Sequence, residues 1–276
     1  DSFVEVVVDQ YLDRVLDYVL PSSFPLPEPG SFAEVPLKHQ TATACILKIK
    51  QESSLPSEKL KPLLRLLEET PPLSPALLKL CRWTAEYYAC PLGMVIKSAV
   101  PGFVFKKRRD KKESLPESNT NSFFQPLPLN PHQLVAFEEI KSGLQSPKKQ
   151  VCLLWGVTGS GKTEVYLQAI QEAHNRNQSA LVIVPEIALT PQLVDIFKKR
   201  FSSPVAVFHS RLTEAERAWY WKKTYSGKIR IAPGARSAIF APLKNLGLII
   251  VDEEHEKTYK QEEAPRYNAR DLAVVR

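Results

Sequence analysis

With 276 residues, of which 43% are hydrophobic and 24% charged, the chain has the composition of a soluble globular protein with room for two domains. No apolar run reaches the length of a membrane span, and the opening residues are not those of a signal peptide. A net charge of +7 favours a polyanionic partner, although such a charge is weak evidence alone. Because Asp1 is not Met and the last residues are typical of the middle of an element, we expect a fragment of a longer protein.

The cysteines are scattered and form no C-x-x-C pair, which argues against a metal site in this chain. We expect reduced, mostly buried thiols and a reducing compartment. The four residues are Cys45, Cys81, Cys90 and Cys152.

The first hundred residues predict a small β-rich domain. Val4, Val6 and Val8 alternate with other side chains, a pattern that we interpret as an edge strand. Residues 32–36 and 43–49 are two further short apolar stretches of the same type.

A helix is predicted from residue 74 to about residue 89. Ser74 suits its N-cap and Pro75 its first turn. Trp83 and Tyr87 do not share the apolar face of this helix, and we expect them to pack against the strands. A role in stacking on nucleic-acid bases is the less favoured alternative.

Residues 103–128 predict a basic, polar linker. Six of the seven residues from 106 to 112 (KKRRDKK) are cations. A solvated tether is the favoured interpretation of this run, and contact with nucleic-acid phosphates is the alternative.

From residue 129 onward, helical and strand-like patterns alternate, which predicts an α/β fold with a parallel sheet and helices on both faces. Ligands bind such sheets at the carboxyl ends of the strands. The expected strands are residues 151–155, 180–184, 205–208, 228–232 and 246–251, and the expected helices begin near residues 130, 164, 190 and 213.

The strongest motif follows the first of these strands. Residues 156–163, GVTGSGKT, fit the pattern G-x-x-x-x-G-K-[ST] of a phosphate-binding loop. Glycines let successive backbone N–H groups turn toward phosphate oxygens, Lys162 reaches the β- and γ-phosphates of ATP, and the Thr163 hydroxyl binds Mg²⁺. The predicted nucleotide contacts of the loop are Gly156, Thr158, Gly159, Ser160, Gly161, Lys162 and Thr163.

A second motif, DEEH at residues 252–255, follows the last apolar strand. Asp252 is expected to hold Mg²⁺, Glu253 to polarise the water that attacks the γ-phosphate, and His255 to sense the phosphate state. Taken alone, the motif is equally compatible with the start of a surface helix. Together with the phosphate-binding loop, it indicates a nucleotide hydrolase with Lys162, Asp252 and Glu253 as catalytic residues.

Further stretches resemble one family. They are LNPHQ (129–133), VPEIALTPQ (184–192), GARSAIFAP (234–242), and YKQE with PRYNARDLAV between residues 259 and 274. With WGVTGSGKTEVYL and LGLIIVDEEH, they closely resemble the bacterial PriA family of replication-restart DNA helicases. The resemblance implies a RecA-like lobe at residues 129–276, with ATP and Mg²⁺ as cofactors.

The resemblance also implies roles for particular residues. Gln133 would contact the adenine, and a loop from residue 259 to residue 267 would couple DNA binding to ATP hydrolysis. The alternative is an ordinary loop with buried tyrosines. The implied coupling residues are His255, Tyr259, Lys260, Arg266 and Tyr267, and Thr190, Arg236 and Ser237 would lie along the single-stranded DNA path.

The resemblance extends more weakly to residues 1–102, which would be a 3′-DNA-end-binding domain. Asp17 would accept a hydrogen bond from a free 3′-hydroxyl, with Tyr18 beside the terminal base. The equally weighted alternative is that Leu16 and Tyr18 are alternate core residues of a strand.

Three departures from the family pattern stand out. The linker is too short for the winged-helix domain usual in the family, and Pro233 and Ala235 replace a branched apolar residue and a hydroxyl residue. The second lobe with its arginine finger and zinc-binding insertion is missing, so we expect this chain alone to hydrolyse ATP slowly, if at all, and zinc only in the missing part.

The family implies an ATP-dependent 3′-to-5′ DNA helicase that recognises stalled or repaired replication forks and starts primosome assembly. Its expected partners are forked and single-stranded DNA, primosome proteins and single-stranded-DNA-binding protein, with no membrane. The alternative is a non-catalytic fork-binding scaffold with a degenerate ATPase.

Overall fold

A computed structural model describes the chain except for residues 1, 54, 103–123 and 202. It divides into two units, which are treated separately below. The first comprises Asp1–Lys112, Lys260–Asn268 and Val275–Arg276, and the second comprises Glu113–Tyr259 and Ala269–Val274. The segment Lys260–Asn268 therefore groups with the N-terminal residues, whereas the predicted limits placed it in the second domain. The basic run at residues 106–112 lies outside the described residues.

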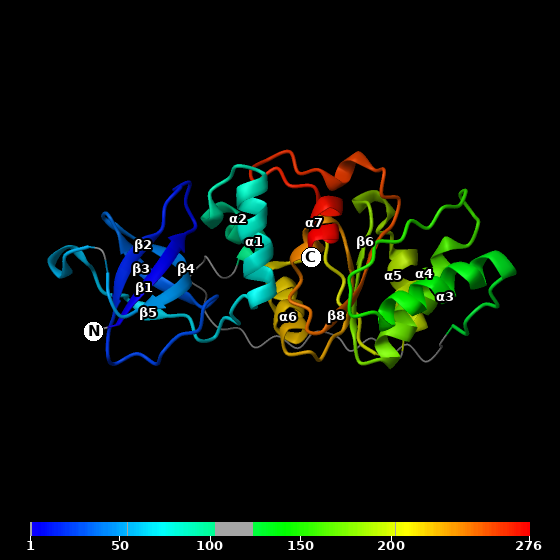
Figure 1. The fold of residues 1–276 in the computed structure, drawn as a ribbon, viewed down its shortest axis with the longest axis horizontal. Coiled ribbons are helices and arrows are strands. Elements are labelled where there is room, and N and C mark those ends of the chain that lie inside the picture. The colour runs from blue at the N-terminus through cyan, green and yellow to red at the C-terminus, as the bar shows by residue number, and fades with distance from the viewer. Residues whose placement is uncertain (1, 54, 103–123, 202) are drawn as a thin grey trace. The chain divides into compact units, whose positions relative to one another are not determined.

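The first unit contains a five-stranded antiparallel sheet in the order β2-β1-β4-β3-β5, drawn as arrows in Figure 1. The prediction that residues 4–8 form an edge strand is wrong, because β1 pairs with β2 on one side and with β4 on the other. Local alternation identified the strand but not its neighbours. The strands are β1 (Ser2–Val8), β2 (Leu16–Leu20), β3 (Phe32–Leu37), β4 (Gln40–Lys50) and β5 (Arg65–Leu66), and a 3₁₀ turn, η1, spans Ser57–Lys59.

The core of this sheet follows from the alternation of its side chains. Val4, Val6 and Val8 are at most 2% exposed and pack in one cluster with Tyr18 of β2 and Ile46 of β4. Burying each of these side chains contributes about 1.5–3 kcal/mol. The cluster therefore supplies a stable scaffold for the loops at the ends of the strands.

Two helices complete the N-terminal part of this unit: α1 (Pro75–Tyr87) and α2 (Leu92–Ala99). The predicted start of α1 is confirmed, because Ser74 Oγ accepts a hydrogen bond from the Leu77 N–H at 3.3 Å. The expectation that Tyr87 packs against the strands is wrong, because Tyr87 is 63% exposed and stacks on Trp83 of the same helix.

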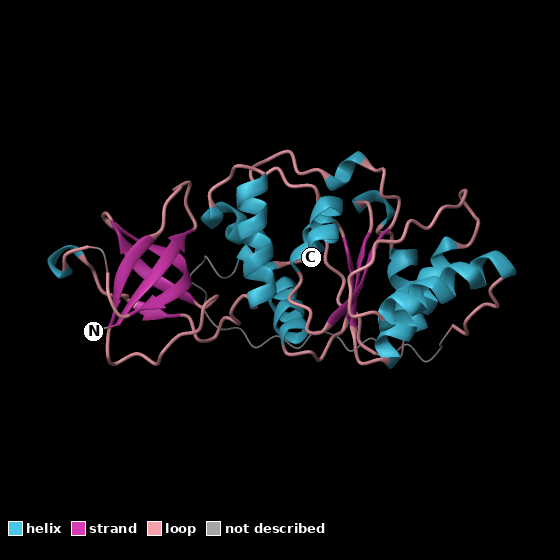
Figure 2. Cartoon of the chain, in the orientation of Figure 1, coloured by secondary structure: helices cyan, strands magenta, loops and turns pink. Residues whose placement is uncertain are grey.

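The second unit contains a three-stranded parallel sheet in the order β7-β6-β8, whose strands are magenta in Figure 2. All five residues of β6 are buried, so this strand is covered on both faces, as predicted. Ile183, at the end of β6, pairs with Gly234 and Val251, so the three carboxyl ends meet at one edge. The strands are β6 (Ser179–Ile183), β7 (Ile231–Gly234) and β8 (Leu246–Val251).

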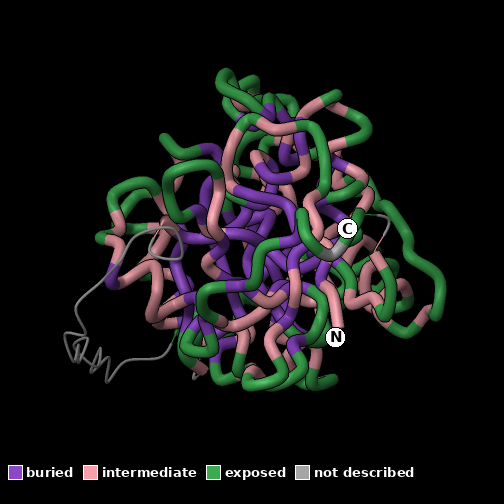
Figure 3. Tube along the Cα trace, turned by 90° about the vertical axis from the view of Figure 1, so that its left-hand side faces the viewer, coloured by how far each residue is buried: buried purple, intermediate pink, exposed green. Residues whose placement is uncertain are grey.

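Helices surround this sheet, and α4 and α5 pack on one of its faces through Ile170 and Phe197, which are fully buried against Val182. Figure 3 colours the buried stretches of the chain purple and the exposed ones green. The helices are α3 (Pro131–Gln145), α4 (Lys162–Asn175), α5 (Pro191–Arg200), α6 (Glu214–Tyr225) and α7 (Ala269–Val275), with 3₁₀ turns η3 (Glu186–Ala188), η4 (Arg236–Phe240) and η5 (Lys257–Tyr259).

Local start signals predicted these helices well. Asn130 and Thr213 each form a capping box, with Gln133 and Glu216 respectively, and Thr190 caps α5. The predicted strand at residues 205–208 is reduced to two isolated bridges with β7, at Val205 and Phe208.

The predicted strand before the phosphate-binding loop is wrong. Residues 151–157 have no strand structure, and Val151, Leu153 and Trp155 are 75%, 73% and 89% exposed. A strand that is apolar on both faces is stable only inside a sheet. Among the described residues, no strand pairs with this stretch, and the sheet ends at β8 on that side.

Candidate functional site

The loop of residues 156–161 has the backbone of a phosphate cradle. Gly159 and Gly161 have φ values of 78° and 80°, in the left-handed region that favours glycine. A Cβ atom on Gly161 would lie 2.4 Å from Gln133 Nε2. Helix α4 begins directly after the loop and has no side-chain cap, so the N–H groups of its first turn face the loop.

Two side chains secure this loop. Lys162 Nζ donates to the carbonyls of Gly156 at 2.6 Å and Val157 at 3.2 Å. Gln133 Nε2 donates to the Ser160 carbonyl at 2.9 Å, while Gln133 Oε1 accepts from the Asn130 N–H at 2.9 Å. Gln133 thus fastens the start of α3 to the loop, a structural contact that the sequence did not indicate.

Asp252 lies at the carboxyl end of β8, beside the start of α4. Tyr166 of α4 donates from its hydroxyl to Asp252 Oδ2 at 3.3 Å, and Tyr166 also hydrogen-bonds with Thr163. Burial raises the pKa of Asp252, the neighbouring Glu253 carboxylate adds to this, and the charge of Lys162 opposes it. The two predicted motifs therefore share one edge of the sheet.

Sequence reasoning missed Tyr166. Its hydroxyl is held between Thr163 and Asp252, and burial followed by the charge of Asp252 raises the pKa of the phenol. Because Tyr166 comes three residues after Thr163 on the same helix, the two lie on one face, and this spacing was a usable signal.

The rest of the DEEH stretch turns away from the strand. Glu253 has a φ of 47°, and its side chain is 43% exposed. His255 Nε2 lies 3.8 Å from Glu253 Oε2, and Glu254 pairs with Arg270 Nη1 at 3.1 Å. Residues 252–255 form turns, so the alternative interpretation of this motif as the start of a helix is wrong.

The predicted coupling tyrosines are buried. Tyr259 and Tyr267 are each 1% exposed. The Tyr259 hydroxyl donates to the Ile183 carbonyl at 3.1 Å and also to the Asp252 carbonyl, so it ties the ends of β6 and β8 together. Neither ring presents a face to bases here, which agrees with the alternative of buried tyrosines. Arg266 Nε donates to the Glu262 carbonyl at 3.1 Å.

The residues predicted along a DNA path lie at element starts. Thr190 is the N-cap of α5, and its Oγ1 accepts from the Leu193 N–H at 3.3 Å. Arg236 begins η4 and donates to the Thr258 carbonyl at 3.2 Å, and the neighbouring Ser237 is exposed. Their contact with DNA stays a prediction.

In the first unit, Asp17 and Tyr18 point to opposite faces of β2. Asp17 accepts hydrogen bonds from Lys50 Nζ at 3.2 Å and Ser53 Oγ at 2.8 Å. Tyr18 is 5% exposed and donates to the Pro36 carbonyl at 2.9 Å. The ring of Tyr18 is therefore a core residue in this structure, and its place beside a base stays a prediction.

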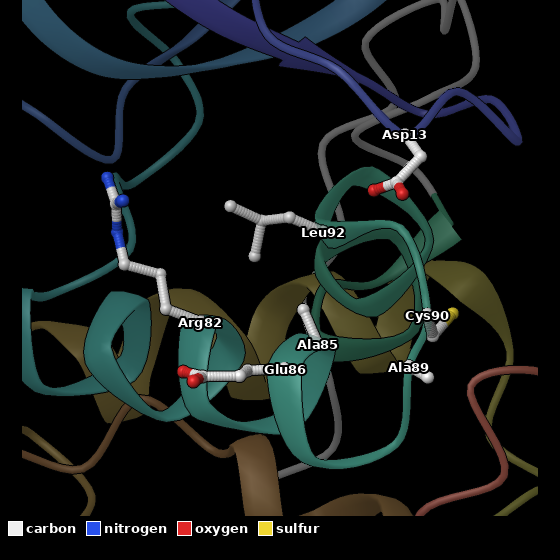
Figure 4. A pocket seen from close by; sticks show the side chains of 7 residues that line it. All are labelled: Asp13, Arg82, Ala85, Glu86, Ala89, Cys90 and Leu92. Atoms are coloured by element: carbon white, nitrogen blue, oxygen red, sulfur yellow. The ribbon is translucent and has the colours of Figure 1, made fainter.

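A shallow hollow of about 430 Å³ lies between the β1–β2 loop and the ends of α1 and α2 (Figure 4). It carries charges of both signs and contains none of the predicted site residues. Its lining residues are Asp13, Arg82, Ala85, Glu86, Ala89, Cys90 and Leu92.

The nucleotide cradle fits a magnesium nucleotide. Ser160 Oγ, a side-chain oxygen of the loop, is buried without a hydrogen-bond partner in the described part of the chain. Within the described ranges, no cluster of three or more His, Cys, Asp or Glu side chains would hold a metal by itself. Mg²⁺ typically takes one or two protein ligands plus phosphate oxygens, which Thr163 and Asp252 can complete. No helix in the described residues is long and apolar enough to cross a membrane.

A glycine-rich loop before a helix, facing an acidic strand end in a parallel sheet, defines a P-loop nucleotide-binding protein. Residues 126–272 match the family described as type III restriction enzyme, res subunit, and residues 5–101 match the 3′DNA-binding domain (3′BD) of PriA. The chain belongs to the PriA family of replication restart proteins.

Three relatives, each named replication restart protein PriA, illustrate the similarity. The Bacillus subtilis protein is 55% identical over 152 residues, covering 55% of this chain and 19% of the relative. The Chlamydia pneumoniae protein is 32% identical over 349 residues, covering 99% and 46%. The Helicobacter pylori (strain J99) protein is 38% identical over 247 residues, covering 89% and 36%. The chain thus spans less than half the length of these relatives.

Proposed function

We propose that the complete protein is an ATP-dependent 3′-to-5′ DNA helicase that recognises stalled or repaired replication forks and starts primosome assembly. The observation that carries this proposal is the approach of the Lys162 loop to Asp252 at one edge of a parallel sheet. The match of residues 5–101 to a 3′ DNA-binding domain supplies the nucleic-acid side of the proposal. A protein that acts on chromosomal DNA would work in the bacterial cytoplasm.

The nucleotide would lie across the loop. Lys162 would turn from its present carbonyl acceptors to the β- and γ-phosphates, and the N–H groups of the loop would bind phosphate oxygens. Gln133 Nε2 has a second N–H and Gln133 Oε1 a second lone pair that its two present hydrogen bonds do not use, and these would contact the adenine. The remaining loop contacts would come from Gly156, Thr158, Gly159, Ser160 and Gly161.

The acidic strand end would supply the chemistry. Thr163 and Asp252 would hold Mg²⁺, which when bound neutralises the charge that develops on the phosphate oxygens. Glu253 would accept a proton from, and orient, the attacking water, because its side chain is exposed beside Asp252. The Tyr166 hydroxyl, between Thr163 and Asp252, would keep both metal ligands in place.

Nucleotide state would pass to DNA through residues that follow Asp252. His255 lies beside Glu253, and Tyr259 is fastened to the Asp252 carbonyl, so both would respond to the strand end. The other coupling residues would be Lys260, Arg266 and Tyr267, and the DNA contacts would be Asp17, Tyr18, Thr190, Arg236 and Ser237. In the cell, primosome proteins and single-stranded-DNA-binding protein would be the protein partners.

The test is ATP turnover by the full-length protein with and without forked DNA. Forked DNA is expected to raise turnover, and Lys162→Ala is expected to lower it by about 100-fold, because a preorganised charge at the phosphates is lost. Lys141→Ala, a surface lysine of α3 paired with Glu138 at 3.3 Å, is the matched control and should behave as the unmodified protein. If forked DNA does not raise ATP turnover, or if Lys162→Ala does not lower it, the helicase proposal is contradicted.

A second candidate, a fork-binding scaffold without turnover, is favoured by one observation. Among the described residues, no strand pairs with the exposed stretch before the phosphate-binding loop, which leaves the loop without the strand that ordinarily supports it. A scaffold would bind forked DNA with the same affinity in the presence and absence of ATP, and in the Lys162→Ala variant. Nucleotide-dependent fork binding would exclude it.

A further inference from the structure

Three aromatic side chains gather at the end of α1, and we call Trp83, Tyr87 and Tyr88 the aromatic platform. The rings of Trp83 and Tyr87 are stacked, with centroids 4.6 Å apart and planes at 15°. Tyr88 meets both edge-on, at 6.3 Å and 85° from Trp83 and at 4.9 Å and 77° from Tyr87. The contacts among the three rings hold them in a defined geometry.

Exposure distinguishes this platform from the other tyrosines of interest. Tyr87 is 63% exposed, whereas Tyr18, Tyr259 and Tyr267 are at most 5% exposed. An aromatic pair spaced i, i+4 on a helix stabilises it only weakly. Tyr87 is thus both exposed to solvent and held by its stack on Trp83, which makes its ring available to a planar ligand.

A cation is fixed beside the platform. Lys260 Nζ lies 4.7 Å from the centroid of the Tyr88 ring, within the range of a cation–π contact. The loop that carries Lys260 is anchored there, because the Asn268 N–H donates to the Tyr88 hydroxyl at 3.1 Å. Lys260 and Asn268 also form an antiparallel bridge, so the position of the lysine is set by backbone as well as by side chain.

We propose that the aromatic platform is a binding site for unpaired bases of single-stranded DNA, with a base stacked on Tyr87 and a backbone phosphate at Lys260. Stacking suits any base, since every base has a π-face, and it requires bases that are not already stacked in a duplex. The site rests on the proposed function, because its ligand is the strand that a helicase separates.

The platform offers an exposed aromatic ring on which a base can stack, and the residues predicted to contact DNA offer none. The rings of Tyr18, Tyr259 and Tyr267 are buried, and Asp17 offers a carboxylate that suits a hydroxyl rather than a base face. Residues 83–88 fall inside the match to the 3′DNA-binding domain. The net charge of +7 favours a negatively charged ligand, such as a DNA strand, over an uncharged apolar peptide.

The experiment measures the affinity of the 276-residue chain for two 3′-phosphorylated strands of equal length, oligo-dT and a strand with abasic sugars. The 3′-phosphate removes the free hydroxyl that Asp17 would read. Tyr87→Ala is expected to weaken oligo-dT binding about tenfold and to leave abasic binding unchanged, because only the first strand stacks. Tyr87→Trp should restore the affinity.

Tyr11→Ala is the matched control, since Tyr11 is 75% exposed in the same unit and, among the described residues, takes no part in the ring contacts of the platform. It should bind both strands as the unmodified chain does. Lys260→Gln should lower the slope of log affinity against log salt by about 0.7, the value for one phosphate contact on a single strand.

The outcomes separate the platform from the wider proposal. Unchanged oligo-dT binding by Tyr87→Ala overturns the platform while the helicase proposal stands, provided that the unmodified chain binds oligo-dT. If Tyr87→Ala loses the same affinity for oligo-dT and for the abasic strand, the platform is overturned as well, because the abasic strand has no bases to stack. A chain that binds neither strand also overturns the platform, and the helicase proposal is then decided by the ATP turnover of the full-length protein. Circular dichroism of each variant confirms that the fold is retained.

Discussion

At the scale of single residues, one buried ion pair stabilises the first turn of α4, which directly follows the nucleotide loop. Arg200 Nη2, at the end of α5, lies 2.8 Å from Glu164 Oε1 in the first turn of α4, and the two side chains are 4% and 14% exposed. The same carboxylate accepts from the Leu127 N–H at 3.2 Å and from Gln168 Nε2 at 2.8 Å. Glu164 directly follows Thr163, so this network fixes the turn of α4 that carries the predicted metal ligand.

Removing Arg200 should therefore be costly. Arg200→Ala is expected to lower the free energy of unfolding by about 3 kcal/mol, because it leaves a buried carboxylate without its charge partner. Arg176→Ala removes an exposed i, i+4 pair with Glu172 at 2.7 Å and should cost less than about 1 kcal/mol. Urea denaturation of both variants measures the difference, and equal costs would show that the Glu164 pair is not desolvated.

The residue scale is also where sequence reasoning reached least far. The motifs identified Lys162 and Asp252 because phosphate chemistry requires those residue types at that spacing. Whether a tyrosine is buried depends on what folds over it: Tyr259 and Tyr267 were expected to offer ring faces and are buried, while Tyr87 was expected to be covered and is exposed. No local pattern carries that information.

At the scale of elements, the end of α1 shows how a turn positions the aromatic platform. The Cys90 N–H donates to the Ala85 carbonyl at 2.9 Å and the Ala89 N–H to the Glu86 carbonyl at 3.3 Å, which is a Schellman motif. Ala89 occupies its left-handed position with a φ of 47°, where glycine is normally found. The turn ends the helix directly after Tyr88 at a cost in backbone strain.

Glycine should relieve that strain. Ala89→Gly is expected to raise the free energy of unfolding by about 0.5–1 kcal/mol, since the left-handed conformation costs a Cβ-bearing residue about 1–2 kcal/mol and glycine loses part of the gain through unfolded-state entropy. Ala85→Gly, one turn earlier in the same helix, should instead lower it by about 1 kcal/mol. Thermal unfolding compares the two, and a destabilising Ala89→Gly would argue against strain at this turn.

Element starts were predictable because their causes are local. Ser74, Asn130, Thr190 and Thr213 each satisfy a backbone N–H within three residues, and all four caps are present. Strand pairing is not local. The same reasoning placed β1 at an edge and residues 151–155 in the sheet, and both placements were wrong, because a strand is defined by neighbours that its own sequence does not name.

At the scale of the whole molecule, the chain exposes apolar surface that a monomer ordinarily covers. Val151, Leu153, Trp155 and Val157 are between 73% and 89% exposed in one continuous stretch. None of the six residues of β8 is fully buried, whereas every residue of β6 is. This exposed apolar stretch should therefore make the chain associate with itself as its concentration rises.

Polar substitutions test this expectation. Leu153→Ser with Trp155→Ser should reduce concentration-dependent light scattering and change the free energy of unfolding by no more than about 0.5 kcal/mol, because exposed side chains contribute little to stability. Phe197→Ser, at a fully buried position, should lower it by about 3 kcal/mol or more. A large loss of stability in the double variant would mean that the stretch is packed after all.

The exposed stretch also carries a ready-made handle for spectroscopy. Cys152 lies within it and is exposed, whereas Cys45 and Cys81 are buried. Burial raises the pKa of the Cys45 thiol, and it raises that of Cys81 to about 12, so neither forms much thiolate at neutral pH. A maleimide dye should therefore label Cys152 before Cys45 and Cys81, and its emission would report whether this stretch becomes shielded when nucleotide is supplied.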